Sequence, residues 1–323
     1  MKQRPVGLIR IWACCGLAAC AWPVNASDLE ADALDKLTVE QARKILATHR
    51  GVVSSQGMKL AYIPAGKFGM GSPRQEAGRE AQEKVHEVEL TQAFYLGTHQ
   101  VTVGQFRKFV DDAKYRTEGE RDGKGGWGVN EKGSLDKDGR FTWSSPGFKQ
   151  TNDHPVVRVS WNDAQAYCRW LSKKENKTYR LPTEAEWEVA ARAGTWTATY
   201  NGDPAGENCY ASSPVLEPIA WYDANSGSTT HAVAQKDANA WGLHDMLGNV
   251  WEWTADWFTA SHRPDRSDQP AVDPVGPPMG VNRVLKGGSF LCHDSYCHRY
   301  RLAARTSSTP DSTTGHQGFR IAT

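Results

Sequence analysis

The chain has 323 residues, with 38 basic and 37 acidic side chains and a formal net charge of +1. This balance lacks the basic excess that nucleic-acid-binding proteins carry, so we expect no nucleic-acid partner. With 13 Trp, 30 Gly and 16 Pro, the composition favours a turn-rich fold of one large or two small domains over a helical bundle or a regular α/β repeat.

Residues 1–26 predict a secretory signal peptide. They hold no acid, carry Lys2, Arg4 and Arg10, and continue into an apolar stretch over residues 11–22 that is too short to span a membrane. We therefore expect cleavage after Ala26 and a periplasmic or secreted protein. Residues 17–20 also resemble a lipoprotein box, so the alternative is a lipoprotein tethered to a membrane through Cys20.

Residues 27–57 predict a polar arm with one amphipathic helix over residues 38–48. A domain over residues 58–323 is expected to follow. It begins with a strand over residues 58–63, and a helix over residues 102–112 comes next. Thr102 and Gln105 stand at the spacing of a capping box at the start of that helix.

The second half of the chain mixes helices and strands without a β-α-β rhythm. Residues 119–147 predict a loop, and residues 155–159 a short strand that leads into a helix from Ser160. Cys168 falls on the apolar stripe of that helix and is interpreted as a core thiol. A second capping box at residues 183–186 opens another helix. Beyond residue 194 we expect mostly loop, with strands over residues 284–286 and 319–322. The prediction is an α+β fold with low regular content.

The placement of cysteines is the most informative feature of the sequence. Of seven cysteines, three lie in the expected signal peptide and four remain. Cys292 and Cys297 lie five residues apart in a polar, aromatic and arginine-rich stretch, where a core thiol is not expected. Paired thiolates form either a structural disulfide, which an oxidising compartment favours, or a site for a soft ion such as Cu(I).

Six segments stand out along the expected domain: residues 63–66 with 70–72, 154–161, 180–188 (RLPTEAEWE), 241–253 (ending in GNVWEW), 287–289 (GGS) and 318–320 (GFR). Together they resemble the formylglycine-generating enzyme family, also called the sulfatase-modifying factors. The resemblance implies a C-type-lectin-like fold with low regular secondary-structure content. The wider superfamily also contains siderophore-tailoring proteins and modules without known chemistry.

Members of the family that oxidise cysteine carry Cys-x-x-x-x-Cys followed by Arg-Tyr-Arg, which this chain matches from Cys292 to Arg301. The resemblance implies that Cys292 and Cys297 are catalytic and bind Cu(I), and that Arg299 and Arg301 favour the thiolates and bind substrate. A purely structural disulfide is the alternative for the two cysteines.

The resemblance also implies that Ser289 takes part in catalysis and that Trp251 binds the substrate peptide in the same cleft. A hydroxyl that caps a turn is the alternative for Ser289, and core packing is the alternative for Trp251. Four residues match a calcium site of the family: Asp245, Gly248, Val250 and Glu252. Oxygen ligands of this kind suit Ca²⁺; a helix cap with a surface ion pair is the alternative.

The sequence departs from the family pattern between residues 194 and 241, where the family's other calcium site cannot be placed. Cys168 matches a cysteine that in animal relatives pairs with one near the C-terminus, a position that is Ile321 here. Cys168 and Cys209 therefore either pair with each other or stay reduced.

The resemblance implies an exported, copper-dependent oxidase that uses O₂ to convert a cysteine of a partner polypeptide, expected to be a sulfatase, to formylglycine. One alternative is a paralogue that oxidises another exported substrate, such as a siderophore precursor or a peptide. The other is a non-catalytic, lectin-like accessory factor for the maturation of a periplasmic metalloenzyme.

Overall fold

The computed structural model describes residues 37–121, 123–129, 134–204, 212–260, 269–293 and 299–323. Its helices are α1 (Val39–Thr48), α2 (Val103–Ala113), α3 (Glu118–Arg121), α4 (Trp161–Glu175), α5 (Glu184–Arg192) and α6 (Asp223–Ser226). Its strands are β1 (Val52–Val53), β2 (Lys59–Ile63), β3 (Gly66–Met70), β4 (His86–Leu90), β5 (Phe94–Gly97), β6 (Gly126–Val129), β7 (Leu135–Asp138), β8 (Trp251–Trp257), β9 (Ala271–Val272), β10 (Arg283–Lys286), β11 (Arg305–Ser308) and β12 (Gln317–Gly318).

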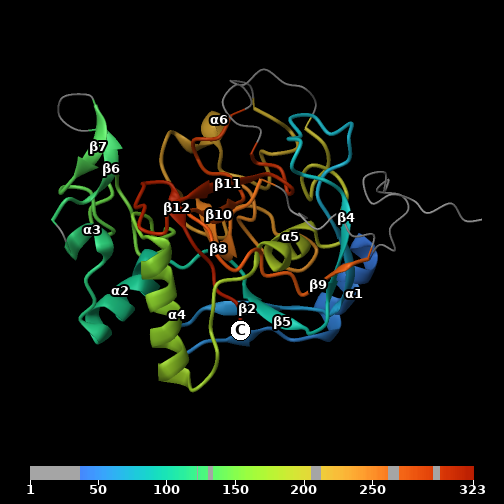
Figure 1. Ribbon diagram of the computed structural model, residues 1–323, viewed down its shortest axis with the longest axis horizontal. Coiled ribbons are helices and arrows are strands. Elements are labelled where there is room, and N and C mark those ends of the chain that lie inside the picture. Colours follow the sequence, from blue (N-terminus) through green and yellow to red (C-terminus); the bar gives the residue numbers. More distant parts are fainter. Residues whose placement is uncertain (1–36, 122, 130–133, 205–211, 261–268, 294–298) are drawn as a thin grey trace, which may run out of the picture.

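A four-stranded sheet in the order β11-β10-β8-β12 lies at the centre of the molecule (Figure 1). Strands β8, β10 and β11 are antiparallel, whereas β12 pairs parallel with β8 and places Gln317 beside Trp251. Parallel neighbours need a long connection, and here β12 lies far beyond β8 in the sequence. Their pairing brings residues near the end of the chain to the start of β8.

Two three-stranded sheets, β1-β2-β5 and β3-β4-β9, and the hairpin β6–β7 complete the fold. Figure 1 shows the hairpin, α2 and α3 on one side of the central sheet and α1 on the opposite side. The C-terminal segment also reaches the first sheet, where Ala322 bridges Leu96. The sheets are thus joined by contacts between distant parts of the sequence.

The predicted helix starts are confirmed. Thr38, Thr102, Ser160 and Thr183 each cap a helix through a capping box, as for Thr102 and Gln105, whose side chains and backbones bond reciprocally. Residues on the inner faces of α2 and α4 meet in an aromatic cluster of Phe106, Phe109, Tyr167 and Phe319. The predicted α+β class is confirmed as well.

The described part of the N-terminal arm packs on the domain. Ala42 of α1 is fully buried, and β1 pairs with β2. At Gly194 a Cβ atom would lie only 2.6 Å from the backbone carbon of Thr38, so the start of α1 runs closely over this glycine. The arm therefore contributes to the hydrophobic core.

Some expected elements differ from those observed. The region 119–147 is not a plain loop, since it contains most of α3 and the hairpin β6–β7. Residues 155–159 form a single bridge instead of a strand, because Arg158 adopts a left-handed backbone with φ of 61° that ends the extended run. The C-terminal strand lies at Gln317–Gly318 and not over residues 319–322.

Strand β8 was not expected at all. It is buried on both faces at residues 251–254, so it lacks the alternation of polar and apolar residues that identifies a half-buried strand. Within the described residues, none of the helices has both the length and the hydropathy that crossing a membrane requires.

Candidate active site

A tight turn links β10 to the segment that carries Cys292. Gly287 and Gly288 have φ of 93° and 74°, conformations that residues with a side chain rarely adopt. A Cβ atom on Gly287 would lie 2.9 Å from the carbonyl oxygen of Met246, and one on Gly288 would lie 2.9 Å from that of Arg299. The two glycines therefore allow the chain to turn against its neighbours directly before Ser289.

Ser289 and Cys292 face each other inside this turn. The Ser289 backbone N–H donates to the Cys292 Sγ at 3.3 Å, and the Ser289 hydroxyl lies 4.0 Å from the same sulfur. The two residues are 1% and 2% exposed. A hydrogen bond to sulfur favours the charged form of a thiol, whereas burial disfavours it, so what the turn supplies is a defined position and one donor for the sulfur. The Ser289 hydroxyl also accepts the Leu291 N–H at 3.3 Å, as a turn-capping hydroxyl would.

Other loops fix the position of this turn. The Phe290 N–H donates to the Asn249 carbonyl at 2.9 Å, and the Ser226 hydroxyl donates to the Phe290 carbonyl at 2.8 Å. The Asp223 N–H donates to the Cys292 carbonyl at 3.1 Å. Because both sides of the turn are hydrogen bonded, the Cys292 sulfur has a defined position.

A pocket of about 200 Å³ opens beside Cys292. Its lining comes from the central sheet and the turn after β10: Trp251, Leu285, Ser289, Leu291, Cys292, Arg299, Thr306, Ser307, His316 and Gln317. Four predicted site residues, Ser289, Cys292, Trp251 and Arg299, are thus brought together. Cys297 lies outside the described residues.

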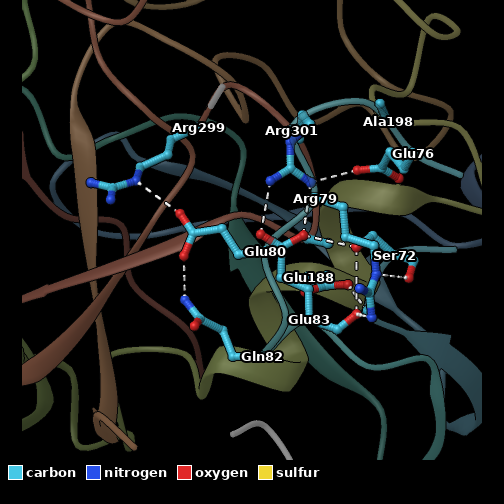
Figure 2. Close-up of polar contacts among 12 residues, drawn as sticks. Ser72, Glu76, Arg79, Glu80, Gln82, Glu83, Glu188, Ala198, Arg299 and Arg301 are labelled. Carbon is cyan, nitrogen blue, oxygen red and sulfur yellow. Dashed lines mark hydrogen bonds and ion pairs between the residues drawn. The ribbon is translucent and has the colours of Figure 1, made fainter. Parts of the chain in front are cut away.

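Arg299 stands at the edge of the pocket and is partly exposed. Its Nη1 donates to the Thr306 hydroxyl at 3.3 Å, and its Nε lies 3.6 Å from Glu80 Oε1. The Glu80 carboxylate also accepts a hydrogen bond from Gln82 at 2.5 Å. Figure 2 shows this chain of side chains reaching from the loop after β3. A half-exposed ion pair of this length is weak, so Arg299 can exchange Glu80 for another partner.

Arg301 occupies a different environment. It is buried, and its guanidinium donates to Glu83 at 2.7 and 2.8 Å and to Glu76 at 2.6 Å (Figure 2). It is not among the residues that line the pocket. Although burial pulls the pKa of Glu83 upward, the hydrogen bonds and charge of Arg301 outweigh this effect and the pKa lies below its ordinary value. Burial raises the pKa of Glu76 in spite of its hydrogen bond from Arg301, so Glu83 is the main counter-ion. The geometry gives Arg301 a structural role in place of substrate contact.

The four residues of the expected calcium site lie around the turn before β8. Asp245 is buried and has a left-handed backbone with φ of 52°. Its Oδ2 accepts the Ala234 N–H at 2.7 Å, while its Oδ1 is buried without a partner among the described residues. Burial raises the pKa of Asp245. An orphaned carboxylate oxygen in this position suits a cation.

Glu252 does not fit the expected role of its side chain. Its two carboxylate oxygens accept hydrogen bonds from Arg320 at 2.6 and 2.7 Å, from Trp187 at 2.7 Å and from Gln100 at 2.9 Å. Arg320 already neutralises this carboxylate. A cation here would therefore rely on Asp245 and on main-chain oxygens, such as those of Gly248 and Val250, which the resemblance implied.

Sequence reasoning missed one wall of the pocket. Thr306 and Ser307 lie on β11, and His316 and Gln317 lie at β12. No local pattern marks them, because the pairing of β11 with β10 places Thr306 and Ser307, and the parallel pairing of β12 with β8 places His316 and Gln317 beside Trp251. The family motifs around Cys292 do not include them.

Cys168 is a core thiol, as predicted. It is 1% exposed, and burial raises its pKa to about 12, so it stays protonated at neutral pH. Cys209 lies outside the described residues. Among the residues with described positions, no three His, Cys, Asp or Glu side chains gather as metal ligands.

Comparison with known proteins supports the family resemblance. Residues 50–323 match the model of the sulfatase-modifying factor enzyme 1-like domain. The formylglycine-generating enzyme of Bos taurus is 36% identical over 82% of this chain and 74% of its own length. That of Thermomonospora curvata is 38% identical over 81% of this chain and 92% of its own length. The inactive C-alpha-formylglycine-generating enzyme 2 of Bos taurus is 32% identical over 83% of this chain and 89% of its own length.

Among solved structures, PvdO from Pseudomonas aeruginosa superposes with a TM-score of 0.68 at 26% identity, covering 84% of this chain and 97% of that one. Treponema denticola variable protein 1 gives a TM-score of 0.62 at 26% identity, covering 85% of this chain and 99% of that one. The expected C-type-lectin-like fold is confirmed. On the family model and these relatives together, the chain belongs to the sulfatase-modifying factor family, which includes the formylglycine-generating enzymes.

Proposed function

We propose that this protein is an exported, copper-dependent oxidase that converts a cysteine of a partner polypeptide, such as a sulfatase, to formylglycine with O₂. Relatives named formylglycine-generating enzyme, similar over most of the chain, support the reaction class. Because an inactive relative is nearly as similar, the proposal depends on the site itself. The observation that carries it is Cys292, held by Ser289 at the wall of a pocket.

The arrangement of side chains suits a visiting thiol. Cys292 and Ser289 form one part of the wall, and the Trp251 side chain gives an apolar surface for the substrate. The Ser289 N–H would stabilise a Cys292 thiolate through its hydrogen bond to the sulfur. Arg299 at the edge of the pocket offers donors to main-chain carbonyls or to a carboxylate of the substrate.

Copper would be held by the thiolates of Cys292 and Cys297, since soft sulfur ligands select Cu(I). When bound there, the ion supplies the one-electron chemistry with O₂ that protein side chains lack. The substrate cysteine loses one Cβ hydrogen and the thiol hydrogen with two electrons, which leaves a carbon–sulfur double bond. Water hydrolyses that bond to the aldehyde and hydrogen sulfide. Reduction of O₂ to water takes four electrons, so a thiol reductant supplies the other two.

The decisive experiment incubates copper-loaded protein with O₂, a thiol reductant and a Cys-x-Pro-x-Arg peptide, and detects the aldehyde by mass spectrometry. We expect product from the wild type, none from Cys292→Ser or Cys297→Ser, and product from the matched control Cys168→Ser. Copper binding and O₂ consumption without aldehyde would point to another exported substrate. Absence of both activities would leave only a non-catalytic accessory role.

Export is part of the proposal and rests on residues 1–26, which lie outside the described residues. Mass analysis of the protein purified from its own cells separates the two forms. A chain that starts after Ala26 supports a secreted or periplasmic protein, and a lipid on Cys20 supports a membrane tether. An unprocessed chain contradicts both.

Calcium is proposed as a structural ion only. It would be held by Asp245, whose Oδ1 is buried without a described partner, together with the main-chain oxygens of Gly248 and Val250. The ion would balance the negative charge of the buried Asp245 carboxylate and stiffen the turn that precedes Trp251.

A further inference from the structure

The segment from Trp221 to His231 lies where the sequence departs from the family pattern, and the chemistry proposed above does not use it. His231 is held there in two ways. Its imidazole stacks on the Trp221 indole, with ring centroids 3.7 Å apart and an angle of 11° between the ring planes. Its backbone N–H and C=O both pair with the side-chain amide of Asn249, at 3.1 Å. The ring and the backbone of His231 therefore both have a defined position.

The His231 ring is connected to the turn that carries Cys292 through Ser226, the last residue of α6. Its Nε2 lies 2.8 Å from the Ser226 carbonyl oxygen, and because a carbonyl can only accept, Nε2 is the donor. The Ser226 hydroxyl accepts the Ser228 N–H at 3.2 Å. The same hydroxyl donates to the carbonyl of Phe290 at 2.8 Å, two residues before Cys292.

These contacts close into a ring of hydrogen bonds. The Phe290 N–H donates to the Asn249 carbonyl at 2.9 Å, and the Asn249 side chain binds the His231 backbone. From the His231 imidazole the path returns through Ser226 to Phe290. Asn249 and Ser226 are 0% and 1% exposed, so their hydrogen bonds are shielded from water. Bonds in such a network support one another, so loss of the bond from His231 would loosen the hold on Phe290.

We propose that His231 is a positioning residue for Cys292. Through Ser226 it holds the Phe290 carbonyl, and with it the turn in which the Ser289 N–H meets the Cys292 sulfur. His231 does not line the pocket beside Cys292, so it acts through the turn and not on the substrate. For its effect on catalysis, the proposal rests on the function proposed above.

The test compares two variants of His231. His231→Phe keeps an aromatic ring for Trp221 but loses the donor, whereas His231→Gln offers an amide N–H donor to the Ser226 carbonyl. The first readout is amide hydrogen exchange of residues 287–292 in the metal-free protein, which reports local opening. We expect exchange about tenfold faster in His231→Phe, the effect of one lost hydrogen bond to a buried partner. His231→Gln should stay within about threefold of the wild type, and exchange in α2 should be unchanged in both.

The second readout is the proposed reaction. In His231→Phe, the dissociation constant for Cu(I), measured by competition with a chelator, should rise about tenfold, and kcat per bound copper should fall by about the same factor. The KM for the peptide should equal that of the wild type, because the residues that line the pocket are intact. Counting bound copper removes any unfolded fraction from kcat, so a general loss of stability would not produce this result.

The matched control is His99→Phe. The His99 imidazole also donates to a backbone carbonyl, that of Gln100, at 2.8 Å, but it lies outside the ring of hydrogen bonds. Its exchange over residues 287–292 and its Cu(I) affinity should equal those of the wild type. Ser226→Ala removes the next bond of the ring, and it should open the same segment even if His231→Phe does not fold.

The inference is overturned if exchange over residues 287–292 stays at the wild-type rate in both His231→Phe and Ser226→Ala. It is also overturned if His231→Gln opens the segment as much as His231→Phe does, since the donor would then be irrelevant. Exchange that follows the expected order while no aldehyde forms supports His231 as a positioning residue and rejects only the oxidase.

Discussion

Arg299 and Arg301 stand two positions apart in the sequence, yet they differ in nearly every physical respect. Arg299 is partly exposed at the pocket, beside Glu80 at 3.6 Å. Arg301 is buried between Glu76 and Glu83. The first can therefore contact a substrate, whereas the second ties the cysteine segment to the loop that follows β3.

Replacing Arg301 with Gln should lower the free energy of unfolding by about 3–5 kcal/mol, because Glu76 and Glu83 would lose their buried counter-ion. Urea denaturation measures the loss. The matched control is Arg299→Gln, which removes a half-exposed ion pair and should cost less than about 1 kcal/mol.

A second variant separates charge from packing at Arg301. Combining Arg301→Met with Glu83→Gln removes charges of both signs, so part of the lost stability should return. If Arg301→Gln destabilises the protein no more than Arg299→Gln does, the structural role of Arg301 is wrong.

At the scale of elements, β8 connects the candidate site to α5. Trp251 at its start lines the pocket, and Asp256 near its end accepts the Glu184 N–H at 2.7 Å, at the first turn of α5. A carboxylate is favourable at a helix N-terminus. Burial nevertheless raises the pKa of Asp256 to about 7, with the charge of Glu184 adding to the effect.

Asp256 makes stability depend on pH in a defined direction. Its native pKa of about 7 lies above the ordinary value of 3.8, so the folded chain binds more protons than the unfolded chain between these values. The contribution of Asp256 to stability therefore falls as pH rises through this window. As the pH rises from 5 to 8, the free energy of unfolding of Asp256→Asn should increase by roughly 2 kcal/mol relative to that of the wild type. Urea denaturation at each pH measures this difference.

The control for this prediction is Asp112→Asn. Asp112 lies on the surface and its pKa is lowered, chiefly by its hydrogen bond from Trp170, so it does not titrate in this window. The difference in free energy of unfolding between this variant and the wild type should be constant from pH 5 to pH 8. A constant difference for Asp256→Asn as well would contradict the raised pKa.

Local signals predicted the elements that depend on neighbours in sequence. The helix starts at Thr102 and Thr183 could be identified because a capping box is complete within four residues. The helix from Ser160 could be identified from the spacing of its apolar residues. Strand β8 and the wall at His316 could not, since their places depend on pairing between residues distant in the sequence, such as Trp253 with Leu285 and Trp251 with Gln317. The turn at Ser289 and Cys292 was predicted through its motif, whereas the burial of Arg301 depended on the loop that carries Glu83.

At the scale of the whole molecule, the turn that carries Asp245 connects segments that are distant in the sequence. The Asp245 carbonyl accepts from Gln100 at 2.8 Å and from Arg320 at 3.3 Å, so the turn contacts segments from both halves of the chain. A cation that compensates its buried carboxylate would stabilise the folded state as a whole.

Millimolar Ca²⁺ should therefore raise Tm by roughly 3–6 °C over protein treated with chelator, as expected for a ligand at about 100 times its dissociation constant. Differential scanning calorimetry measures the shift. Asp245→Asn should abolish it, and Mg²⁺ at the same concentration should not reproduce it. Identical transitions with Ca²⁺ and with chelator would remove calcium from the proposal.

The parallel pairing of β12 with β8 also decides which part of the chain completes the pocket. His316 and Gln317 form one wall, so a chain cut before residue 316 has an incomplete pocket. The pocket beside Cys292 therefore forms only once this late segment has been synthesised and has docked against the start of β8.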